Sequence, residues 1–112
     1  MGNEGHKNLN FIQSQLKSPP MSEAAQDEAG FFLRQLQAGR RLSMPISRPM
    51  PSIGKNVHEL RIVDRNVTWR VVYRIGEKTI DVVEVFAKKT QATPKGVIDQ
   101  CQRRLKEYDG GK

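Results

Sequence analysis

The sequence predicts an α+β fold, with helices packed on one face of a small twisted antiparallel sheet. Two segments between residues 57 and 75 alternate apolar and polar side chains with the two-residue period of a strand, and a third, at residues 79–87, is a short and largely apolar run. Two other segments, at residues 22–38 and from residue 93 onward, repeat apolar side chains at the spacing of a helix. The 112 residues, 37% of them hydrophobic, suit a single domain with one modest core.

The N-terminal part is predicted to contain a short strand followed by helical structure. Residues 1–6 are glycine-containing and polar, and we expect them to be disordered. A strand is expected around Asn8–Ile12, and a helical turn around Gln13–Lys17. Apolar residues then recur at helical spacing from 25 to 36, so we expect a helix with Ser22 as its N-cap, which Gly39 ends. Together these segments predict an N-terminal helix or helical hairpin.

The remaining elements follow from alternation and from turn residues. Residues 40–56 contain too many prolines for a helix or a central strand and are predicted to be a loop. Strands are expected at Val57–Val63, Val67–Ile75 and Thr79–Ala87, joined by short turns into an antiparallel meander. The third strand is apolar on both faces, which favours a central position. Thr93 as N-cap and Pro94 as first residue then open a last helix. Its apolar stripe is Val97, Ile98, Cys101 and Leu105, with Arg103, Arg104 and Lys106 outside.

Composition excludes several classes of protein. The single cysteine, Cys101, allows no intramolecular disulfide, and one cysteine with two histidines cannot form a zinc site of normal ligand count. No apolar run approaches the ~20 residues of a membrane span, and the polar N-terminus lacks the apolar region of a secretory signal. We therefore expect a cytoplasmic protein that needs no metal and no cofactor.

The net charge of +7 is concentrated in the second half of the chain. Between Lys55 and Lys106 there are twelve Lys or Arg against six Asp or Glu, whereas the remaining residues carry seven against six. A polyanion such as nucleic acid is one explanation, and a surface of solvated lysines is the other.

Cations on the predicted strands are the candidate chemical groups. Arg61 shares a strand face with Glu59, Arg70 lies in mid-strand between apolar neighbours, and Lys88 and Lys89 end the third strand. Such cations could hold a phosphate and stabilise the added charge of a pentacoordinate transition state. RNA cleavage by a neighbouring 2′-hydroxyl needs only alignment, a proton acceptor, a proton donor and positive charge. The alternative for both arginines is cross-strand pairing with Glu59, Asp81 or Glu84.

The sequence resembles the phage-derived HigB-like branch of the RelE/ParE toxin superfamily. The resemblance covers roughly residues 7–108 and rests on DEAG at 27–30, MPSIG at 50–54, VHELRI at 57–62, WRVVY at 69–73 and FAKKTQATP at 86–94. The last run is the most specific, because fold physics alone does not require it. The order of elements in the family agrees with the order predicted from periodicity.

The resemblance implies a RelE-like toxin of a type II toxin–antitoxin system that cleaves messenger RNA on the ribosome. It also implies a hetero-oligomer with a cognate helix-turn-helix antitoxin. The catalytic basic positions of the family map onto Arg61, Arg70 and Lys89, with Lys88 beside them. Phe86 is a candidate for stacking on a base, and Thr90 and Gln91 are candidates for binding RNA.

The proton acceptor is the point where the sequence departs from the family pattern. Some relatives use a tyrosine on the C-terminal segment, and no tyrosine is present around Lys95. Glu59 and Tyr73 are the remaining candidates, and His58 is expected to be a surface strand residue.

Two other functions stay open at this point. One is that of a ParE-like, non-enzymatic inhibitor of DNA gyrase, and the other is that of an inactive relative that binds nucleic acid or protein. The antitoxin could bind along the exposed side of the Ser22–Ala38 helix, which we favour, or as an extended segment at the sheet edge near Arg61.

Overall fold

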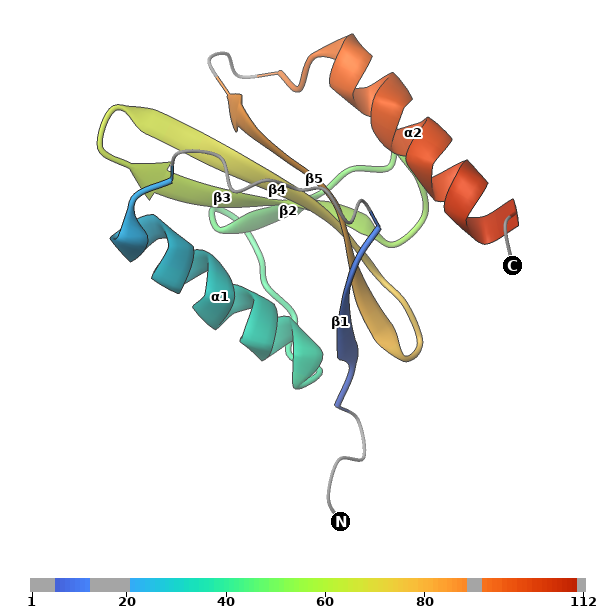
Figure 1. Ribbon diagram of the computed structural model, residues 1–112, viewed down its shortest axis with the longest axis horizontal. Helices are drawn as coiled ribbons and strands as arrows, with labels where there is room; N and C mark the ends of the chain where they lie inside the picture. The colour runs from blue at the N-terminus through green and yellow to red at the C-terminus, as the bar shows by residue number, and fades with distance from the viewer. Residues whose placement is uncertain (1–5, 13–20, 89–91, 111–112) are drawn as a thin grey trace.

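The structure, a computed structural model, describes residues 6–12, 21–88 and 92–110. Within these ranges the chain forms five strands and two helices (Figure 1). The elements are β1 (Asn8–Phe11), α1 (Glu23–Gln37), β2 (Ser47–Pro49), β3 (Val57–Asp64), β4 (Val67–Ile75), β5 (Thr79–Lys88) and α2 (Lys95–Gly110). The strands make one sheet in the order β1-β5-β4-β3-β2.

The central meander has the predicted form. β3 pairs antiparallel with β4, and β4 pairs antiparallel with β5, so consecutive strands are neighbours. β5 lies between β1 and β4, which agrees with the inner position predicted from its apolar residues on both faces. The β4–β5 pairing shifts its register between Val72 and Tyr73, as it does at a β-bulge.

The two outer strands change the predicted antiparallel sheet into a mixed one. β1 pairs parallel with β5, from Asn8 opposite Thr79 to Phe11 opposite Val82. β2 lies inside the segment predicted to be a loop and pairs with Leu60, Glu59 and His58 of β3. Its proline is accommodated because an edge strand has one side free of ladder hydrogen bonds. A three-residue strand is too short to give an alternation signal.

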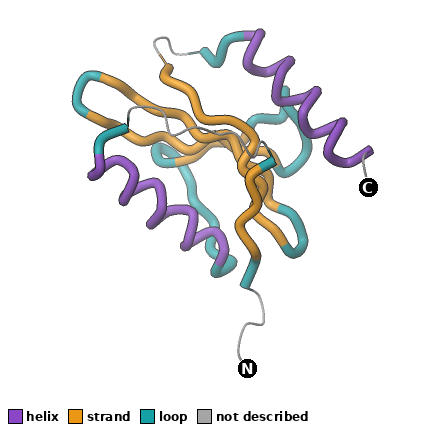
Figure 2. The backbone as a smooth tube through the Cα atoms, viewed as in Figure 1, coloured by secondary structure: helices purple, strands orange, loops and turns teal. Residues whose placement is uncertain are grey.

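The helices cover opposite faces of the sheet, and the prediction of helices on one face is wrong (Figures 1 and 2). α1 packs on a cluster that includes Leu60, Val71 and Tyr73, and α2 packs on a second cluster that includes Val57 and Val72. β3, β4 and β5 carry apolar residues on both of their faces, so each face of the sheet has apolar area to bury.

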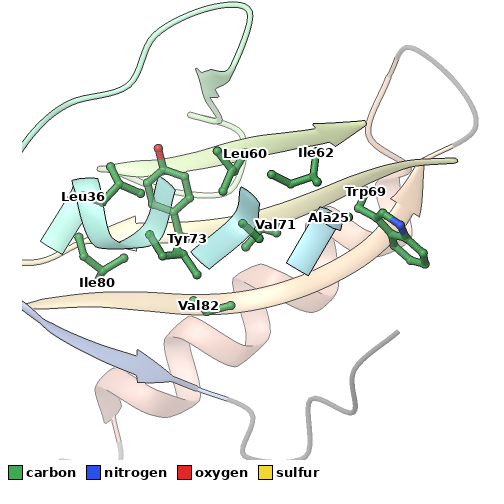
Figure 3. Packing of buried hydrophobic residues seen from close by; sticks show 11 residues of the cluster. Ala25, Leu36, Leu60, Ile62, Trp69, Val71, Tyr73, Ile80 and Val82 are labelled. Carbon is green, nitrogen blue, oxygen red and sulfur yellow. The ribbon is translucent and has the colours of Figure 1, made fainter. Parts of the chain in front are cut away.

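α1 begins and ends as predicted. The Ser22 hydroxyl accepts a hydrogen bond from the backbone N–H of Ala25 at 3.1 Å, and Gly39 has a φ of 90°. Four α1 residues, Ala25, Ala29, Leu33 and Leu36, are buried against the sheet, and Figure 3 shows this packing. The first regular element is strand β1, which agrees with the strand expected around Asn8–Ile12. The helical turn expected at Gln13–Lys17, and residues 1–5 of the segment expected to be disordered, lie outside the described residues.

α2 keeps its predicted stripe but not its predicted cap. Cys101 and Leu105 are buried, and Val97 and Ile98 pack beside them. The helix begins at Lys95, and the Thr93 hydroxyl contacts Glu59 instead of capping it. Arg104 was predicted to point outward; it is half-buried, donates to the Val83 carbonyl at 2.9 Å and pairs with Glu84. The bonds of Thr93 and Arg104 are long-range, which local pattern cannot reveal.

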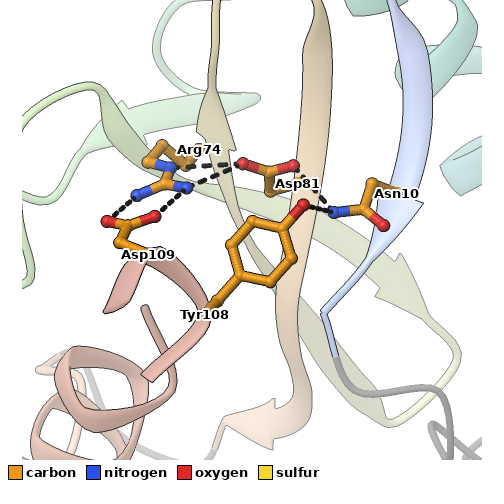
Figure 4. Close-up of polar contacts among 5 residues, drawn as sticks. All are labelled: Asn10, Arg74, Asp81, Tyr108 and Asp109. Atoms are coloured by element: carbon orange, nitrogen blue, oxygen red, sulfur yellow. Dashed lines mark hydrogen bonds and ion pairs between the residues drawn. The ribbon is translucent and has the colours of Figure 1, made fainter. Parts of the chain in front are cut away.

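A polar network fixes the C-terminal end of α2 to the sheet (Figure 4). Arg74 of β4 donates to Asp81 of β5 at 3.0 and 3.2 Å and to Asp109 of α2 at 2.9 Å. Asn10 of β1 donates to Asp81 at 3.1 Å and to the Tyr108 hydroxyl at 2.9 Å. α2 is therefore held over one end of this sheet face, while Arg61 remains exposed on the same face.

Candidate functional site

A row of cross-strand neighbours lies on the sheet face that α2 covers in part. In the register of the sheet Arg61 of β3 is opposite Arg70 of β4, and Arg70 is opposite Phe86 of β5. Side chains that are directly opposite share one face of a sheet, so the three predicted site residues are brought together. Arg61 is exposed, Phe86 is half-buried against the second core cluster, and the Arg70 side chain is 14% exposed.

Glu59 lies on the same face as this row and is fully buried, at 0% exposure. Its Oε1 accepts from Arg48 Nε at 3.2 Å and lies 3.4 Å from Arg70 Nη1. Its Oε2 accepts from the Thr93 hydroxyl at 2.7 Å, and that hydroxyl also accepts from Arg48 Nη2 at 3.2 Å. Burial of a carboxylate is costly unless it is paired and hydrogen-bonded, and here both oxygens have donors.

The site has more positive charge than negative charge. Arg48 and Arg70 contact the carboxylate of Glu59, and Arg61 lies opposite Arg70. The Arg61 side chain makes no hydrogen bond or ion pair with any residue that the structure describes. Desolvation lowers the pKa of Arg70, Glu59 raises it, and the charges of Arg48 and Arg61 lower it again. Because an arginine does not deprotonate in proteins, this crowding favours an anion at the site.

One donor of Arg70 has no partner in the described parts of the chain. Arg70 Nε is buried and makes no hydrogen bond within the described ranges. A buried N–H without a partner loses its bonds to water and gains nothing in return. An anion beside the exposed Arg61 and the partly exposed Arg70 would reduce the repulsion between the two guanidinium groups.

The lysines of the predicted site are placed only in part. The backbone of Lys88 is at the end of β5, opposite Thr68. Lys89, Thr90 and Gln91 lie outside the residues that the structure describes. The chain is described again from Ala92, and Thr93 directly after it contacts Glu59, so both ends of this short segment are next to the arginine row.

Two other candidate residues lie on the opposite face of the sheet. Tyr73 is fully buried in the α1 cluster, and its hydroxyl is 2.7 Å from that of Ser47. Burial raises the pKa of Tyr73, so its phenolate is not favoured. His58 stacks on Tyr73, with ring centroids 5.5 Å apart, and is half-buried instead of exposed. Desolvation lowers the pKa of His58. The sheet therefore separates both side chains from Arg61 and Arg70.

The cross-strand pairing considered as an alternative occurs for one of the two arginines. Arg70 pairs with Glu59, whereas Asp81 pairs with Arg74 and Glu84 pairs with Arg104. Arg61 has no such partner in the described parts of the chain. A structural role for Arg61 therefore has no contact to support it.

Sequence reasoning missed Arg48 and Thr93 as members of this cluster. Arg48 lies between prolines in a segment predicted to be a loop, and Thr93 precedes a proline, where a helix cap is the usual interpretation. A charged side chain on a three-residue edge strand carries no periodic signal. Thr93 could have been found from the T-P ending of the family motif at 86–94.

Other features of the surface lie away from these arginines. A hollow of about 360 Å³ at the start of α1 is lined by Glu23, Glu28 and Val63 among others. Another, of about 270 Å³ at the end of α1, is lined by Lys7, Arg40 and Arg41 among others. Within the described ranges, no cluster of three or more His, Cys, Asp or Glu side chains could hold a metal ion. No described helix has the length and apolar character to cross a membrane.

The fold and the site define a class: a small basic α+β protein with a row of arginines on one sheet face. Residues 19–106 match the family described as "Phage derived protein Gp49-like (DUF891)". Because this match spans more than half of the chain, the protein belongs to the Gp49-like family. The family is of the RelE/HigB toxin-like type and is associated with toxin–antitoxin systems. No curated protein matches the chain.

Proposed function

We propose that the protein is the toxin of a type II toxin–antitoxin system and cleaves messenger RNA on the ribosome in the cytoplasm. The observation that carries the proposal is the row of Arg61 and Arg70, which lie opposite each other on one sheet face and bear excess positive charge. Within the described residues Glu59 pairs with Arg70 and not with Arg61, so pairing with this carboxylate does not account for Arg61. Membership of the toxin-like family supports the same function.

The proposed reaction is attack of an RNA 2′-oxygen on the adjacent phosphorus. The 2′-hydroxyl gives its proton to water, the new bond to phosphorus forms as the bond to the 5′-oxygen breaks, and the leaving oxygen takes up a proton, so a cyclic phosphate and a 5′-hydroxyl result. Arg61 and Arg70 would hold the phosphate and stabilise the negative charge that grows in the transition state. Lys89, with Lys88 beside it, would donate a proton to the leaving oxygen, because neighbouring cations favour loss of a proton from a lysine.

Binding of the RNA strand would extend along the end of β5. Phe86 is in register with Arg70 and could stack on a base next to the bound phosphate. Thr90 and Gln91 follow directly in the chain and would supply hydrogen-bonding groups. This arrangement places phosphate contacts and base contacts next to each other on one face.

A helix-turn-helix antitoxin is the proposed partner, in a toxin–antitoxin hetero-oligomer. The exposed side of α1 carries Glu23, Asp27 and Glu28, so an acidic segment would be repelled there. β2 pairs with β3 from His58 to Leu60, and the Arg61 N–H donates to the Ile46 carbonyl at 2.8 Å. The Arg61 side chain is exposed, and β3 beyond Arg61 has no strand partner on this side within the described residues. The edge of β3 near Arg61 is therefore the better site for an acidic segment, in place of the α1 surface that the sequence favoured.

The test is induced expression in bacteria with pulse labelling of protein and DNA synthesis and mapping of messenger RNA ends. We expect protein synthesis to stop and new ends to appear within reading frames. Arg70→Ala and Lys89→Ala should each reduce cleavage on the order of 100-fold, because each removes a group that stabilises the transition state.

The matched control is Arg103→Ala, since Arg103 is exposed on α2 and away from the row. This variant should remain as toxic as the wild type. Prior loss of DNA synthesis would instead point to gyrase as the target. Full toxicity of a folded Arg70→Ala, Lys89→Ala double variant would contradict the proposed site.

A further inference from the structure

Glu59 is the centre of a buried polar cluster that joins three separate parts of the chain. Arg48 comes from the edge strand β2, Arg70 from β4, and Thr93 from the segment before α2. A general base must reach the proton that it removes within hydrogen-bond distance. The Glu59 carboxylate is 0% exposed and both of its oxygens already accept hydrogen bonds. Its geometry therefore suits holding its hydrogen-bond partners in position, and not removing a proton from a substrate.

We propose that Glu59 is a positioning residue, that Arg48 is the third phosphate-binding cation of the site, and that Thr93 holds both of them in place. This inference rests on the proposed function for its cleavage readout and goes beyond it in assigning these three residues. Its binding readout, given below, does not depend on cleavage.

The position of Arg48 supports its role. Its Nε and Nη2 are fixed by Glu59 and Thr93, and its Nη1 has no acceptor among the residues described. The side chain is 34% exposed, so the free end of the guanidinium faces solvent. Pre-ordering by a carboxylate lowers the entropic cost of binding a phosphate, since a free arginine has many rotamers.

The charge of the cluster matches the proposed transition state. Three guanidinium groups and one carboxylate leave two positive charges. A phosphodiester carries one negative charge, and attack of a deprotonated 2′-oxygen adds a second. With Arg61 and Arg70 alone, the charge of Glu59 would reduce the excess to one. Arg48 therefore restores the charge that the pentacoordinate species needs.

Thr93 joins Glu59 to Arg48. Its side chain is buried, at 8% exposure, and its hydroxyl both donates to Glu59 and accepts from Arg48. This double contact fixes the carboxylate and the guanidinium relative to each other. Small displacements of a group that holds the reacting phosphate have large effects on rate.

The first test compares Thr93→Val with Thr93→Ser in single-turnover cleavage. Valine keeps the shape but leaves Glu59 Oε2 without its donor, so we expect a loss of about 10-fold or more. Serine restores the hydroxyl and should keep the rate within about 3-fold of the wild type. Thermal unfolding of each variant checks that the fold is intact. A folded Thr93→Val that cleaves at the wild-type rate would overturn this role of Thr93.

The second test is the pH–rate profile of Glu59→Gln. A positioning role predicts a rate lower on the order of 100-fold over the whole pH range, with the acid limb of the profile retained. If Glu59 were the proton acceptor, its replacement would remove that limb. Loss of the limb would therefore overturn the inference. Where Glu59→Gln does not fold, the Thr93 pair of variants decides.

The third test measures binding of a 2′-O-methyl oligonucleotide, which has no attacking hydroxyl. Arg48→Ala and Arg48→Lys should both weaken binding by about 10-fold. Alanine removes the cation, and lysine keeps the charge but lacks the planar guanidinium that binds a phosphate through two donors. Arg103→Ala should bind as the wild type does. If the wild type binds the oligonucleotide but cleaves no RNA, the proposed function fails and this comparison still decides the role of Arg48. Wild-type affinity of Arg48→Ala, or no binding by the wild type, would overturn it.

Discussion

Carboxylates buried in this small domain are each held by their own set of donors. Glu59 is held by Arg48, Arg70 and Thr93 on the face of the arginine row. Asp64, at the end of β3 on the opposite face, accepts from the Ser22 N–H at 2.9 Å and from the Trp69 indole N–H at 3.1 Å. Asp64 therefore joins the start of α1 to the sheet through hydrogen bonds from neutral groups, and its negative charge lies near the positive end of the helix dipole.

Asp64 gives a prediction about pH. The hydrogen bonds from Ser22 are the main reason why the pKa of Asp64 is lowered. A group whose pKa is lower in the folded state contributes stability above its unfolded pKa, and this stability is lost as the pH falls through the folded pKa. We expect the free energy of unfolding to fall more steeply in the wild type than in Asp64→Asn between about pH 5 and pH 2. Urea denaturation at several pH values measures this, and parallel profiles would contradict it.

At the scale of elements, the docking of α2 depends on one ion-paired network as well as on its apolar stripe. Arg74 bridges Asp81, which is 2% exposed, and Asp109, which is 53% exposed. The two carboxylates contribute differently to the stability of the fold. An exposed ion pair stabilises it little, whereas a buried charge that loses its partner destabilises it strongly. The network thus concentrates its stabilising effect at β4 and β5.

This difference predicts the order of two substitutions. Arg74→Ala should lower the free energy of unfolding by about 3–5 kcal/mol, because Asp81 stays buried with only the Asn10 amide to replace its cation. Asp109→Asn should cost at most about 1 kcal/mol, since Asp109 is largely solvated. Urea denaturation at neutral pH measures both values. Equal losses in the two variants would show that the helix contact, and not the buried carboxylate, carries the effect.

Local pattern predicted the elements that repeat a period, and missed those fixed by distant contacts. The alternation in β4 placed Arg70 and Tyr73 on opposite faces, and Ser22 and Gly39 predicted the ends of α1. β2 gave no signal because it has three residues. The face covered by α2 was mispredicted, although Val72 and Val83 on the second face already required a cover. In the alternation of the sequence these two valines fall on the side that carries polar residues, whereas in the fold both are buried in the second core cluster.

The sequence likewise indicated the arginine row of the site but not the buried cluster around Glu59. Arg61 and Arg70 could be placed on one face from their strands alone, and the register of β3 and β4 puts them opposite each other. The contact of Glu59 with Arg48 depends on the β2–β3 pairing, and its contact with Thr93 spans 34 positions. Pairing between segments that are far apart in sequence has no local signature, so the buried cluster became visible only in the folded chain.

At the scale of the whole molecule, the two sheet faces differ in what they present to a polyanion. The outer side of α1 is acidic at Glu23, Asp27 and Glu28, whereas the other sheet face carries Arg48, Arg61 and Arg70. Elsewhere in the described residues, Arg74, Arg104 and Lys95 are paired with carboxylates. Arg48, Arg61 and Arg70 form a limited group of cations that gives their sheet face a local excess of positive charge.

This limited group predicts how RNA affinity depends on salt. Five phosphate contacts, made by Arg48, Arg61, Arg70, Lys88 and Lys89, imply a slope of about −3.5 for log affinity against log salt, because each contact on a single strand contributes about −0.7. Affinity for the 2′-O-methyl oligonucleotide should then fall about 100-fold between 50 and 200 mM salt. Arg61→Ala should make the slope shallower by about 0.7, and Arg103→Ala should leave it unchanged. Fluorescence anisotropy over this salt range measures the slopes. An equal change of slope in both variants would mean that the charge binds RNA diffusely, without a site at the arginine row.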